Sequence, residues 1–475
     1  MHRQLYDGLR AYVLDGRLGP ETRLPATRLL AQQLGVGRNT VIAAYDQLLA
    51  EGYIEARPGS GTWVATLRQT VSKAAVASDG AASFDLSTRG QQIASHPPPT
   101  RTRDKINLHP GFPEAADFPF ATWARLLARN ARRPVADLLS YYDFAGDQRL
   151  RKAIAEYLAV SRGVDCVAEQ VIVVSGAQAA LDLVARIMMD DGDTAWMEEP
   201  GYRGARSALL GAGARLLPLR VSREGWRLND PGLRPPRLVY VTPSCQWPLG
   251  TIMRMEERLQ LLAIAERRKA FIIEDDYDGE YRFRGRPVPA LRALDRSERV
   301  IYVGTFGKTL FSSLRLGFLV VPRALSEPFA RAVSVTGQFA PLLLQATLAD
   351  FIREGYFAAH LRRMRRLYAR RQEHFIELCR RHLGQWMTVS ENDSGMQVFG
   401  RFRLPLDDRE VAAAALPHGI DVQPVSINFH HDEAEHGLLL GYAGLNGEQT
   451  VRAIAALQAT FQDLARSRPR RNRRA

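Results

Sequence analysis

The sequence predicts an α/β protein with two unequal parts: a small N-terminal winged helix-turn-helix and a large domain built on a mostly parallel sheet. Three observations predict this organisation. Two short amphipathic helices joined by a glycine-containing turn precede a hairpin near the N-terminus. A stretch rich in Ser, Thr, Ala and Pro follows. Beyond residue 105, continuous apolar strands alternate with helices, as they do in parallel sheets.

Composition places the chain among globular proteins. Hydrophobic residues make up 46% and charged residues 24% of the 475 residues, which excludes pervasive disorder and fibrous folds. No apolar stretch approaches the roughly 20 residues of a membrane span, and the N-terminus lacks the apolar core of a secretory signal. Cys166, Cys245 and Cys379 form neither a disulfide framework nor a zinc motif. These observations predict a soluble cytoplasmic protein.

The charge is strongly positive but concentrated at one end. The net charge is +13. Residues 1–68 hold eight Arg against six acids, whereas residues 466–475 hold six Arg and no acid. We expect this last segment to be a disordered basic tail. Such a tail can neutralise phosphates but cannot recognise a base sequence, so a DNA-binding prediction needs a motif.

The first 66 residues contain such a motif. Residues 2–15 form an expected amphipathic helix, and residues 26–34 form a second, which Gly35 terminates. A third helix begins at Arg38, with its apolar residues on one face: Val41, Ala44, Tyr45, Leu48 and Leu49. Residues 53–64 then predict two short strands around a Pro-Gly-Ser-Gly turn, which is a wing.

Residues 23–64 resemble the winged-helix DNA-binding domain of the GntR superfamily. The resemblance implies that the third helix enters the major groove, that the preceding helix contacts phosphate, and that the wing approaches the minor groove. The residues that match these roles are Arg38, Asn39 and Thr40, then Arg28, then Arg57 and Gly59. Gly37 replaces the family's usual Ser, which removes a hydroxyl contact. The alternative is a small helical module whose arginines are merely solvated.

Residues 67–105 predict a flexible linker. They show no sustained hydrophobic period, and the three prolines at 97–99 favour an extended segment. The large domain is then expected over residues 106–465.

Five apolar strands are expected in that domain, each ending in polar residues. In open parallel sheets the ligand lies beyond the carboxyl ends of the strands, so these endings should meet at one site. The strands are expected at 171–175, 194–199, 237–242, 271–276 and 299–305.

Two of these strand endings carry candidate ligand-binding residues. The first runs into residues 175–178, Ser-Gly-Ala-Gln, at the start of a helix, where free backbone N–H groups can hold a phosphate. Another ends in Asp275, Asp276 and Tyr277. Alternation along a strand places Asp275 and Tyr277 on one side and Asp276 on the other.

Lysine usage singles out Lys308. The chain contains 64 Lys and Arg residues, of which only five are lysine. One of them, Lys308, follows a buried strand directly and precedes Arg315 by seven residues. Only a primary amine can form a Schiff base, so a lysine beside a carboxylate, a tyrosine and a phosphate cradle indicates pyridoxal phosphate. The alternative is a solvated loop lysine.

Residues 106–460 resemble the fold-type-I aminotransferases, which add a smaller C-terminal α+β subdomain. The resemblance rests on YVGTFGKTLFSSLRLGF, VIVVSGAQAALDL and FIIEDDYDGEYRF. It implies that Lys308 is the internal aldimine lysine, that Asp275 pairs with the pyridine nitrogen and that Tyr277 pairs with the phenolic oxygen. It also implies a phosphate site of Gly176, Ala177, Gln178, Thr305 and Arg315, with Tyr202 against the ring.

Both motif sets on one chain resemble the MocR/GabR family of bacterial transcription regulators. The family implies domain-swapped homodimers that bind operator DNA, and a large domain that senses pyridoxal phosphate or an amine. Two alternatives remain: an active aminotransferase with an appended DNA-binding domain, and a cofactor-free domain that serves only dimerisation.

Several positions depart from the aminotransferase pattern. The resemblance places Leu439 at the position of the arginine that clamps the substrate carboxylate, and no Arg or Lys occurs from Glu410 to Val451. Arg203 or Arg206 could substitute. Further departures are Cys245 for His, Leu249 for Thr and Gly307 for Ser. The segment 427–436 holds three His and three acids, but its spacing matches no metal motif, so no metal site is expected.

Overall fold

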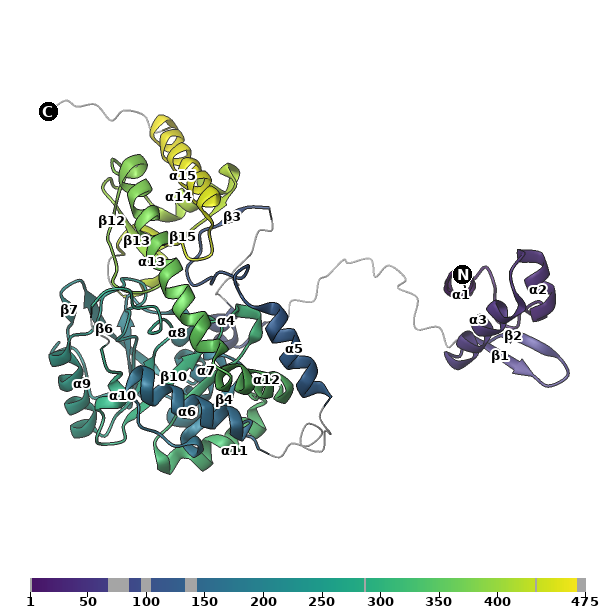
Figure 1. Cartoon of the computed structure of the whole chain (residues 1–475), viewed down its shortest axis with the longest axis horizontal. Helices are drawn as coiled ribbons and strands as arrows, with labels where there is room; N and C mark the ends of the chain where they lie inside the picture. Colours follow the sequence, from purple (N-terminus) through teal and green to yellow (C-terminus); the bar gives the residue numbers. More distant parts are fainter. Residues whose placement is uncertain are drawn as a thin grey trace. The chain divides into compact units, whose positions relative to one another are not determined.

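The computed structural model describes residues 2–66, 85–94, 104–132, 143–285, 288–431 and 434–467 (Figure 1). The chain forms two compact units, Met1–Asp85 and Leu86–Ala475. Within these ranges, no helix has both the length and the apolar character needed to cross a bilayer.

The first unit is the predicted winged helix-turn-helix. It contains α1 (His2–Leu14), α2 (Thr27–Leu34), α3 (Arg38–Ala50), β1 (Ile54–Arg57) and β2 (Gly61–Val64). Gly35 ends α2 in the left-handed conformation, and β1 and β2 pair as an antiparallel hairpin. The predicted apolar face of α3 is buried from Val41 to Leu48, and the Tyr45 hydroxyl donates to the Pro25 carbonyl at 2.9 Å. This side chain fixes the turn before α2 onto α3.

A short helix lies inside the segment predicted to be a flexible linker. Helix α4 (Thr88–Ala94) packs on α8 (Arg203–Gly211), where Ile93 lies beside Gly211 and Arg89 pairs with Asp191 at 2.9 Å. This part of the predicted linker is therefore helical, and it has both an apolar and an ionic partner on the large unit. Residues 67–84 and 95–103, with the three prolines, lie outside the described residues.

The large unit is built on an eight-stranded sheet that is mostly parallel, as predicted (Figure 1). All five predicted strands are present; β6, β7 and β11 were not predicted. Strand β11 runs antiparallel to both of its neighbours. The order across the sheet is β4 (Val171–Val174), β11 (Gly317–Val320), β10 (Val300–Thr305), β9 (Phe271–Asp275), β8 (Leu238–Val241), β5 (Thr194–Glu199), β6 (Arg215–Ser222) and β7 (Gly225–Trp226).

Helices cover both faces of this sheet. The strands are apolar throughout because each face packs on its own core: Val171 and Val173 belong to one hydrophobic cluster, and Ile172 and Val174 to another. The covering helices include α6 (Gln148–Arg162), α7 (Ala177–Met188), α9 (Met255–Arg268), α10 (Leu291–Leu294) and α11 (Ser326–Thr336).

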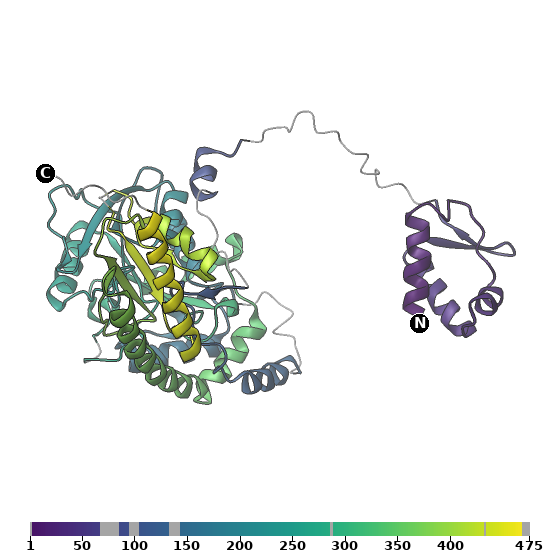
Figure 2. The ribbon, with the colours of Figure 1, turned by 90° about the horizontal axis from the view of Figure 1, so that it is seen from above.

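A smaller α+β subdomain follows the long helix α13 (Tyr356–Leu383) (Figures 1 and 2). Its four-stranded sheet has the order β12 (Met387–Val389), β13 (Gln397–Phe402), β16 (Gly437–Gly441) and β15 (Gln423–Pro424), with α14 (Asp408–Ala415) and α15 (Gly447–Ser467). The short strands β3 (Ile106–Asn107) and β14 (Ile420–Asp421) pair in parallel. The predicted basic tail lies outside the described residues from 468 onward.

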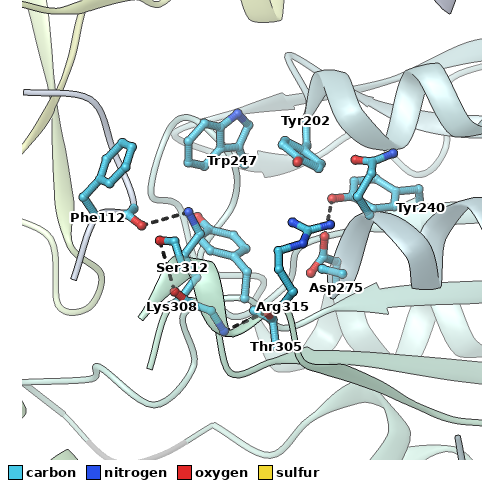
Figure 3. A pocket seen from close by; sticks show the side chains of 14 residues that line it. Phe112, Tyr202, Tyr240, Trp247, Asp275, Thr305, Lys308, Ser312 and Arg315 are labelled. Atoms are coloured by element: carbon cyan, nitrogen blue, oxygen red, sulfur yellow. Dashed lines mark hydrogen bonds between the residues drawn. The ribbon is translucent and has the colours of Figure 1, made fainter. Parts of the chain in front are cut away.

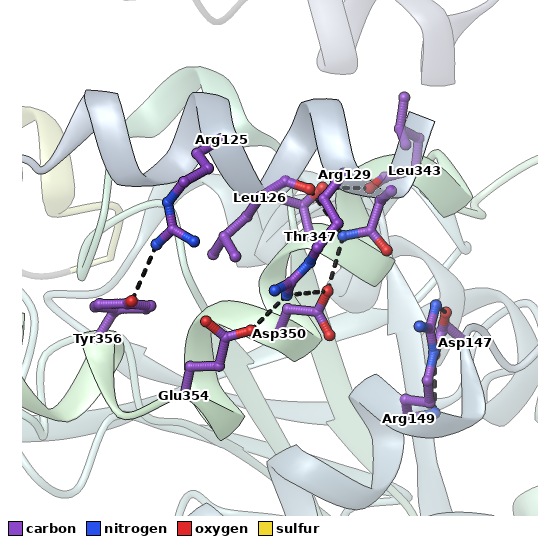
Figure 4. Close-up of polar contacts among 11 residues, drawn as sticks. Arg125, Leu126, Arg129, Asp147, Arg149, Leu343, Thr347, Asp350, Glu354 and Tyr356 are labelled. Atoms are coloured by element: carbon purple, nitrogen blue, oxygen red, sulfur yellow. Dashed lines mark hydrogen bonds and ion pairs between the residues drawn. The ribbon is translucent and has the colours of Figure 1, made fainter. Parts of the chain in front are cut away.

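Polar contacts hold α5 (Phe120–Ala131) against α12 (Leu342–Arg353) and the start of α13 (Figure 4). Arg129 pairs with Asp350 at 2.8 Å and also with Glu354, and the Asn130 amide donates to Asp350 at 2.9 Å. Arg125 donates to the Tyr356 hydroxyl at 3.0 Å. These contacts hold in place the helix that follows Gly111 and Phe112 in the chain.

Candidate functional site

One cavity of about 380 Å³ lies where the strand endings meet, as the parallel topology predicts (Figure 3). Asp275 ends β9, Thr305 ends β10, and Ala177 begins the helix after β4. The residues that line it are Gly111, Phe112, Ala177, Gln178, Tyr202, Tyr240, Trp247, Asp275, Tyr277, Thr305, Gly307, Lys308, Ser312 and Arg315. Eight of the nine residues predicted for a cofactor site belong to this set; Gly176, the ninth, immediately precedes Ala177.

Lys308 lies in this cavity with its amine near the backbone. Its Nζ donates to the Gly111 carbonyl at 2.9 Å. Burial lowers the pKa of Lys308 below its usual value, while the carboxylates of Asp278 and Asp275 act in the opposite direction. A lysine with a lowered pKa has a larger fraction of neutral amine, which is the nucleophilic form.

Asp275 presents a carboxylate oxygen without a partner. Its Oδ2 accepts a hydrogen bond from the Tyr240 hydroxyl at 2.8 Å, whereas Oδ1 is buried and has no hydrogen-bond partner among the described residues. Burial raises the pKa of Asp275 to about 7, against the opposing effect of the Tyr240 hydrogen bond. A buried acceptor without a donor is costly, so a ligand N–H at this position would satisfy it.

The start of α7 forms an anion-binding turn. Gly176 has a φ of 103°, a conformation that favours glycine, and α7 begins without a side-chain cap. The Arg315 guanidinium carbon would lie 3.5 Å from a Cβ atom at Gly176. Free helix N–H groups and a neighbouring guanidinium together suit a phosphate. Thr305 accepts a hydrogen bond from the Gly307 N–H at 3.1 Å, and Gln178 donates to the Gly204 carbonyl at 2.9 Å.

Three aromatic side chains form one wall of the cavity. Trp247 makes edge-to-face contacts with Tyr202 at 6.1 Å and with Tyr277 at 5.8 Å between ring centroids. Burial raises the pKa of Tyr202 to about 12, and the Tyr277 hydroxyl accepts from the Gln397 amide at 3.4 Å. The wall therefore presents hydroxyl donors on an otherwise apolar surface.

The predicted alternation along β9 is present in the structure. Asp275 and Tyr277 line the cavity, whereas Asp276 does not. Asp276 instead pairs with Arg162 at 2.7 Å and accepts from the Tyr302 hydroxyl at 2.7 Å. Asp276 thus anchors the strand while its two neighbours face the ligand space.

Of the positions that depart from the aminotransferase pattern, Gly307 lines the cavity, whereas Leu439, Cys245 and Leu249 do not. Leu439, on β16, is fully buried. Neither Arg203 nor Arg206 lines the cavity, and Arg206 is buried in an ion pair with Glu199 at 3.2 Å. Cys245 is also buried, which raises the pKa of its thiol to about 12. Among the described residues, Lys308 and Arg315 are the only basic residues that line the cavity.

Sequence reasoning missed five lining residues. Gly111 and Phe112 come from the loop after β3, far along the chain from Lys308, and no local pattern marks them. Tyr240 occurs in a predicted strand, but its hydrogen bond to Asp275 requires the pairing of β8 with β9. The other two are Trp247 and Ser312; Trp247 stands between the noted positions Cys245 and Leu249, which could have drawn attention to it.

The predicted DNA-binding residues lie on the first unit. Arg28, Arg38 and Asn39 are exposed, and Thr40 is half-buried. Neither Arg28 nor Arg38 has an ion-pair partner among the described residues. These side chains are free to meet phosphates or base edges.

The arginine of the wing is paired with acidic residues. Arg57 pairs with Glu21 at 2.6 Å and with Glu55, and its guanidinium lies 5.1 Å from the centre of the Trp63 ring. Arg57 is therefore held on the wing by neighbouring acids. Gly59 is exposed in the turn between β1 and β2.

The histidine-rich segment contributes to a structural network. The carboxylate of Asp408 accepts hydrogen bonds from the Ser426 hydroxyl at 2.6 Å and from the Ser426 N–H at 2.8 Å, and His436 lies 3.4 Å away. Asp407, Asp408 and His436 are close enough to share a cation, but the oxygens of Asp408 already bind protein donors.

A winged helix joined to an aminotransferase-like domain defines a DNA-binding transcription regulator whose large domain has the architecture of an enzyme. Residues 1–64 match the gntR family of bacterial regulatory proteins, and residues 103–457 match aminotransferase class I and II. The chain belongs to the MocR-type regulators of the GntR superfamily, with an aminotransferase class I and II domain.

Two relatives and one solved structure illustrate this membership. The chain is 57% identical over 467 residues to a probable rhizopine catabolism regulatory protein, MocR, of Rhizobium meliloti, covering 98% of this chain and 95% of the relative. It is 30% identical to a pyridoxine biosynthesis regulator, PdxR, of Corynebacterium glutamicum, covering 95% and 94%. The α-aminoadipate aminotransferase LysN of Thermus thermophilus superposes with a TM-score of 0.73 at 26% identity, covering 80% of this chain and 98% of LysN.

Proposed function

We propose that this regulator is pyridoxal-phosphate-dependent, and that its large domain senses the cofactor, an amine effector or both through a Schiff base at Lys308. One observation carries the proposal. The buried amine of Lys308 shares a cavity with the unpartnered oxygen of Asp275, and an anion-binding turn adjoins them. Each of the three features suits a different part of pyridoxal phosphate.

The proposed roles follow the chemistry of each group. Asp275 accepts from the pyridine N–H, Tyr277 donates to the phenolic oxygen and Tyr202 lies against the ring. The phosphate is held by Gly176, Ala177, Gln178, Thr305 and Arg315. When bound, pyridoxal phosphate supplies an aldehyde that condenses with a primary amine and gives a visible absorption band. Lys308 is the primary amine that this cavity offers.

The relatives support a sensory role. PdxR is named as a regulator of pyridoxine biosynthesis, and MocR as a probable regulator of rhizopine catabolism. Regulators of such pathways respond to small molecules, and the cavity of about 380 Å³ has the size of a small-molecule site.

We also propose that the first unit binds operator DNA as part of a domain-swapped homodimer. Exposed Arg38, Asn39 and Thr40 at the start of α3 would contact bases, and Arg28 would contact phosphate. Arg57 and Gly59 would lie toward the minor groove. Arg57 would exchange its acidic partners for DNA phosphates.

The visible absorption spectrum of the full chain with pyridoxal phosphate tests the cofactor site. The wild type should show the band of a cofactor joined to lysine, and Lys308→Ala should lack it. Lys152→Ala is the matched control because Lys152 is exposed, with 74% of its side chain accessible. A band that persists in Lys308→Ala would contradict the proposed role of Lys308.

Catalytic turnover is the competing function. The buried lysine and the aspartate on β9 are both present, so an amine donor and a keto acid could react here. Product formed in large excess over protein would favour an active aminotransferase. Product limited to one equivalent would favour a sensor.

A further inference from the structure

An apolar cluster includes Leu439, the position that the sequence resemblance assigns to the carboxylate-binding arginine of aminotransferases. Four buried residues form it: Trp247, Phe399, Val425 and Leu439. Tyr202 and Tyr277 pack against the cluster and also line the cavity (Figure 3). The cluster therefore backs the aromatic wall of the pocket, and its four side chains carry no charge.

Neither Arg203 nor Arg206, the two arginines that could replace the clamp, lines the cavity. Among the described residues that line the cavity, only Lys308 and Arg315 carry a basic group. Arg315 lies at the phosphate-binding turn, beside Gly176. Arg206 is 5% exposed and bound to Glu199. A ligand carboxylate on the aromatic side would therefore lose water without gaining a cation.

The polar atom of Trp247 is also occupied. Its indole N–H donates to the Asn428 side-chain oxygen at 3.0 Å, and the Asn428 amide donates to the Val425 carbonyl at 3.1 Å. Asn428 thus holds the indole in place and takes the only donor that Trp247 could offer to an anion. Neutral polar groups can still bond to the Tyr202 and Tyr277 hydroxyls.

We propose that this pocket selects primary amines that carry no carboxylate on the amine-bearing carbon, and that Leu439 sets this preference. The inference rests on the proposed function and identifies the class of effector for the same site. A carboxylate would be buried against the aromatic wall of Trp247, Tyr202 and Tyr277, which Leu439 backs, without a charged partner. An amine with an apolar or hydroxylated body meets no such cost.

Matched ligand pairs test this selectivity. Phenethylamine and phenylalanine differ only by the carboxylate, as do isoamylamine and leucine. Each ligand is titrated into the full chain loaded with pyridoxal phosphate, and the change in the cofactor's visible band gives its apparent affinity. The amine of each pair should bind at least about tenfold more tightly than the amino acid, the loss expected for an unpaired buried charge.

Two variants assign the preference to one position. Leu439→Arg should improve binding of the amino acids by about tenfold and reverse or abolish the preference. Val160→Arg adds the same side chain where the wild-type residue is 91% exposed, and it should keep the wild-type ratio. If Leu439→Arg does not fold, the selectivity is tested by the wild type alone, from the ratio of its affinities for the amine and the amino acid of each pair.

The outcomes separate the two proposals. Equal or tighter binding of phenylalanine and leucine by the wild type would overturn the selectivity while leaving the cofactor site intact. Absence of a cofactor band in the wild type would overturn the proposed function itself, and the selectivity with it.

Discussion

At the scale of single residues, the absence of a side chain at Gly111 allows the backbone to approach the Lys308 amine closely. A Cβ atom at Gly111 would lie 2.1 Å from the Lys308 amine, and its φ of 74° disfavours other residues. We expect Gly111→Ala to displace Lys308 and weaken binding of pyridoxal phosphate by tenfold or more, measured from its visible band.

Gly419→Ala is the control for Gly111→Ala, because it introduces the same backbone strain without a steric clash. Gly419 has a similar φ of 79°, but no atom lies within 4 Å of its Cβ position. This variant should lose about 1 kcal/mol of stability and keep the wild-type affinity for the cofactor. Equal affinities in both variants would show that the contact with Lys308 is unimportant.

The recognition helix offers a second test at this scale. Arg38 is exposed at the start of α3, so Arg38→Ala should reduce affinity for a DNA fragment selected by the wild type, by about 1–3 kcal/mol at fixed salt. Arg17 lies in the same unit, 66% exposed and outside the helix-turn-helix, and Arg17→Ala is the control. Similar losses in both variants would indicate a nonspecific charge effect.

At the scale of elements, a buried ion pair fixes the end of β9 to α6 and β10. Arg162 and Asp276 are both buried, and Tyr302 on β10 also bonds to Asp276. Arg162→Ala would leave a buried carboxylate without its cation and should cost about 3–5 kcal/mol, seen as a lower thermal transition of the large unit. Arg466→Ala removes an exposed arginine, 78% accessible, and should leave that transition unchanged.

Element-level prediction succeeded where a local pattern was sufficient. Continuous apolar runs located β4, β5, β8, β9 and β10, and the period of two placed Asp275 and Tyr277 on the same side. Strand β11 was not predicted because its short apolar run directly follows the polar segment around Arg315. Helix α4 was not predicted because its formation depends on contacts with the large unit, which no local sequence pattern encodes.

The candidate site was predictable only in part for the same reason. Lys308, Asp275 and Arg315 follow apolar strands or their endings, and the resemblance to aminotransferases assigned their roles. Gly111 and Trp247 reach the cavity only after distant segments pack together. The ion pair between Arg206 and Glu199 could not be predicted either, because it depends on where α8 begins.

At the scale of the whole molecule, buried carboxyl groups make the stability of the cofactor-free protein depend on pH. Burial raises the pKa of Glu198, Glu274 and Asp275 to about 7 and that of Asp278 to about 8. The folded chain therefore retains protons that the unfolded chain releases near pH 4. The stabilisation of the folded state by these protons is complete below about pH 4 and is lost as the pH rises through about 7 to 8.

These four groups should lower the thermal transition of the cofactor-free protein as the pH is raised from about 5 to 8. Asp278→Asn removes one titrating group at similar volume and should make the decrease smaller. A transition temperature that rises over this range would contradict the expectation. Scanning calorimetry at several pH values provides the measurement.

The contact between Lys308 and Gly111 has a consequence for signalling. Gly111 follows residues 67–105 closely in the chain, and that stretch leads back to the DNA-binding unit. A ligand that took the Lys308 amine away from the Gly111 carbonyl would remove a backbone contact that lies shortly after the segment joining the two units. Any resulting coupling is reciprocal by thermodynamic linkage: if the ligand changes DNA affinity by some factor, DNA changes the ligand's affinity by the same factor.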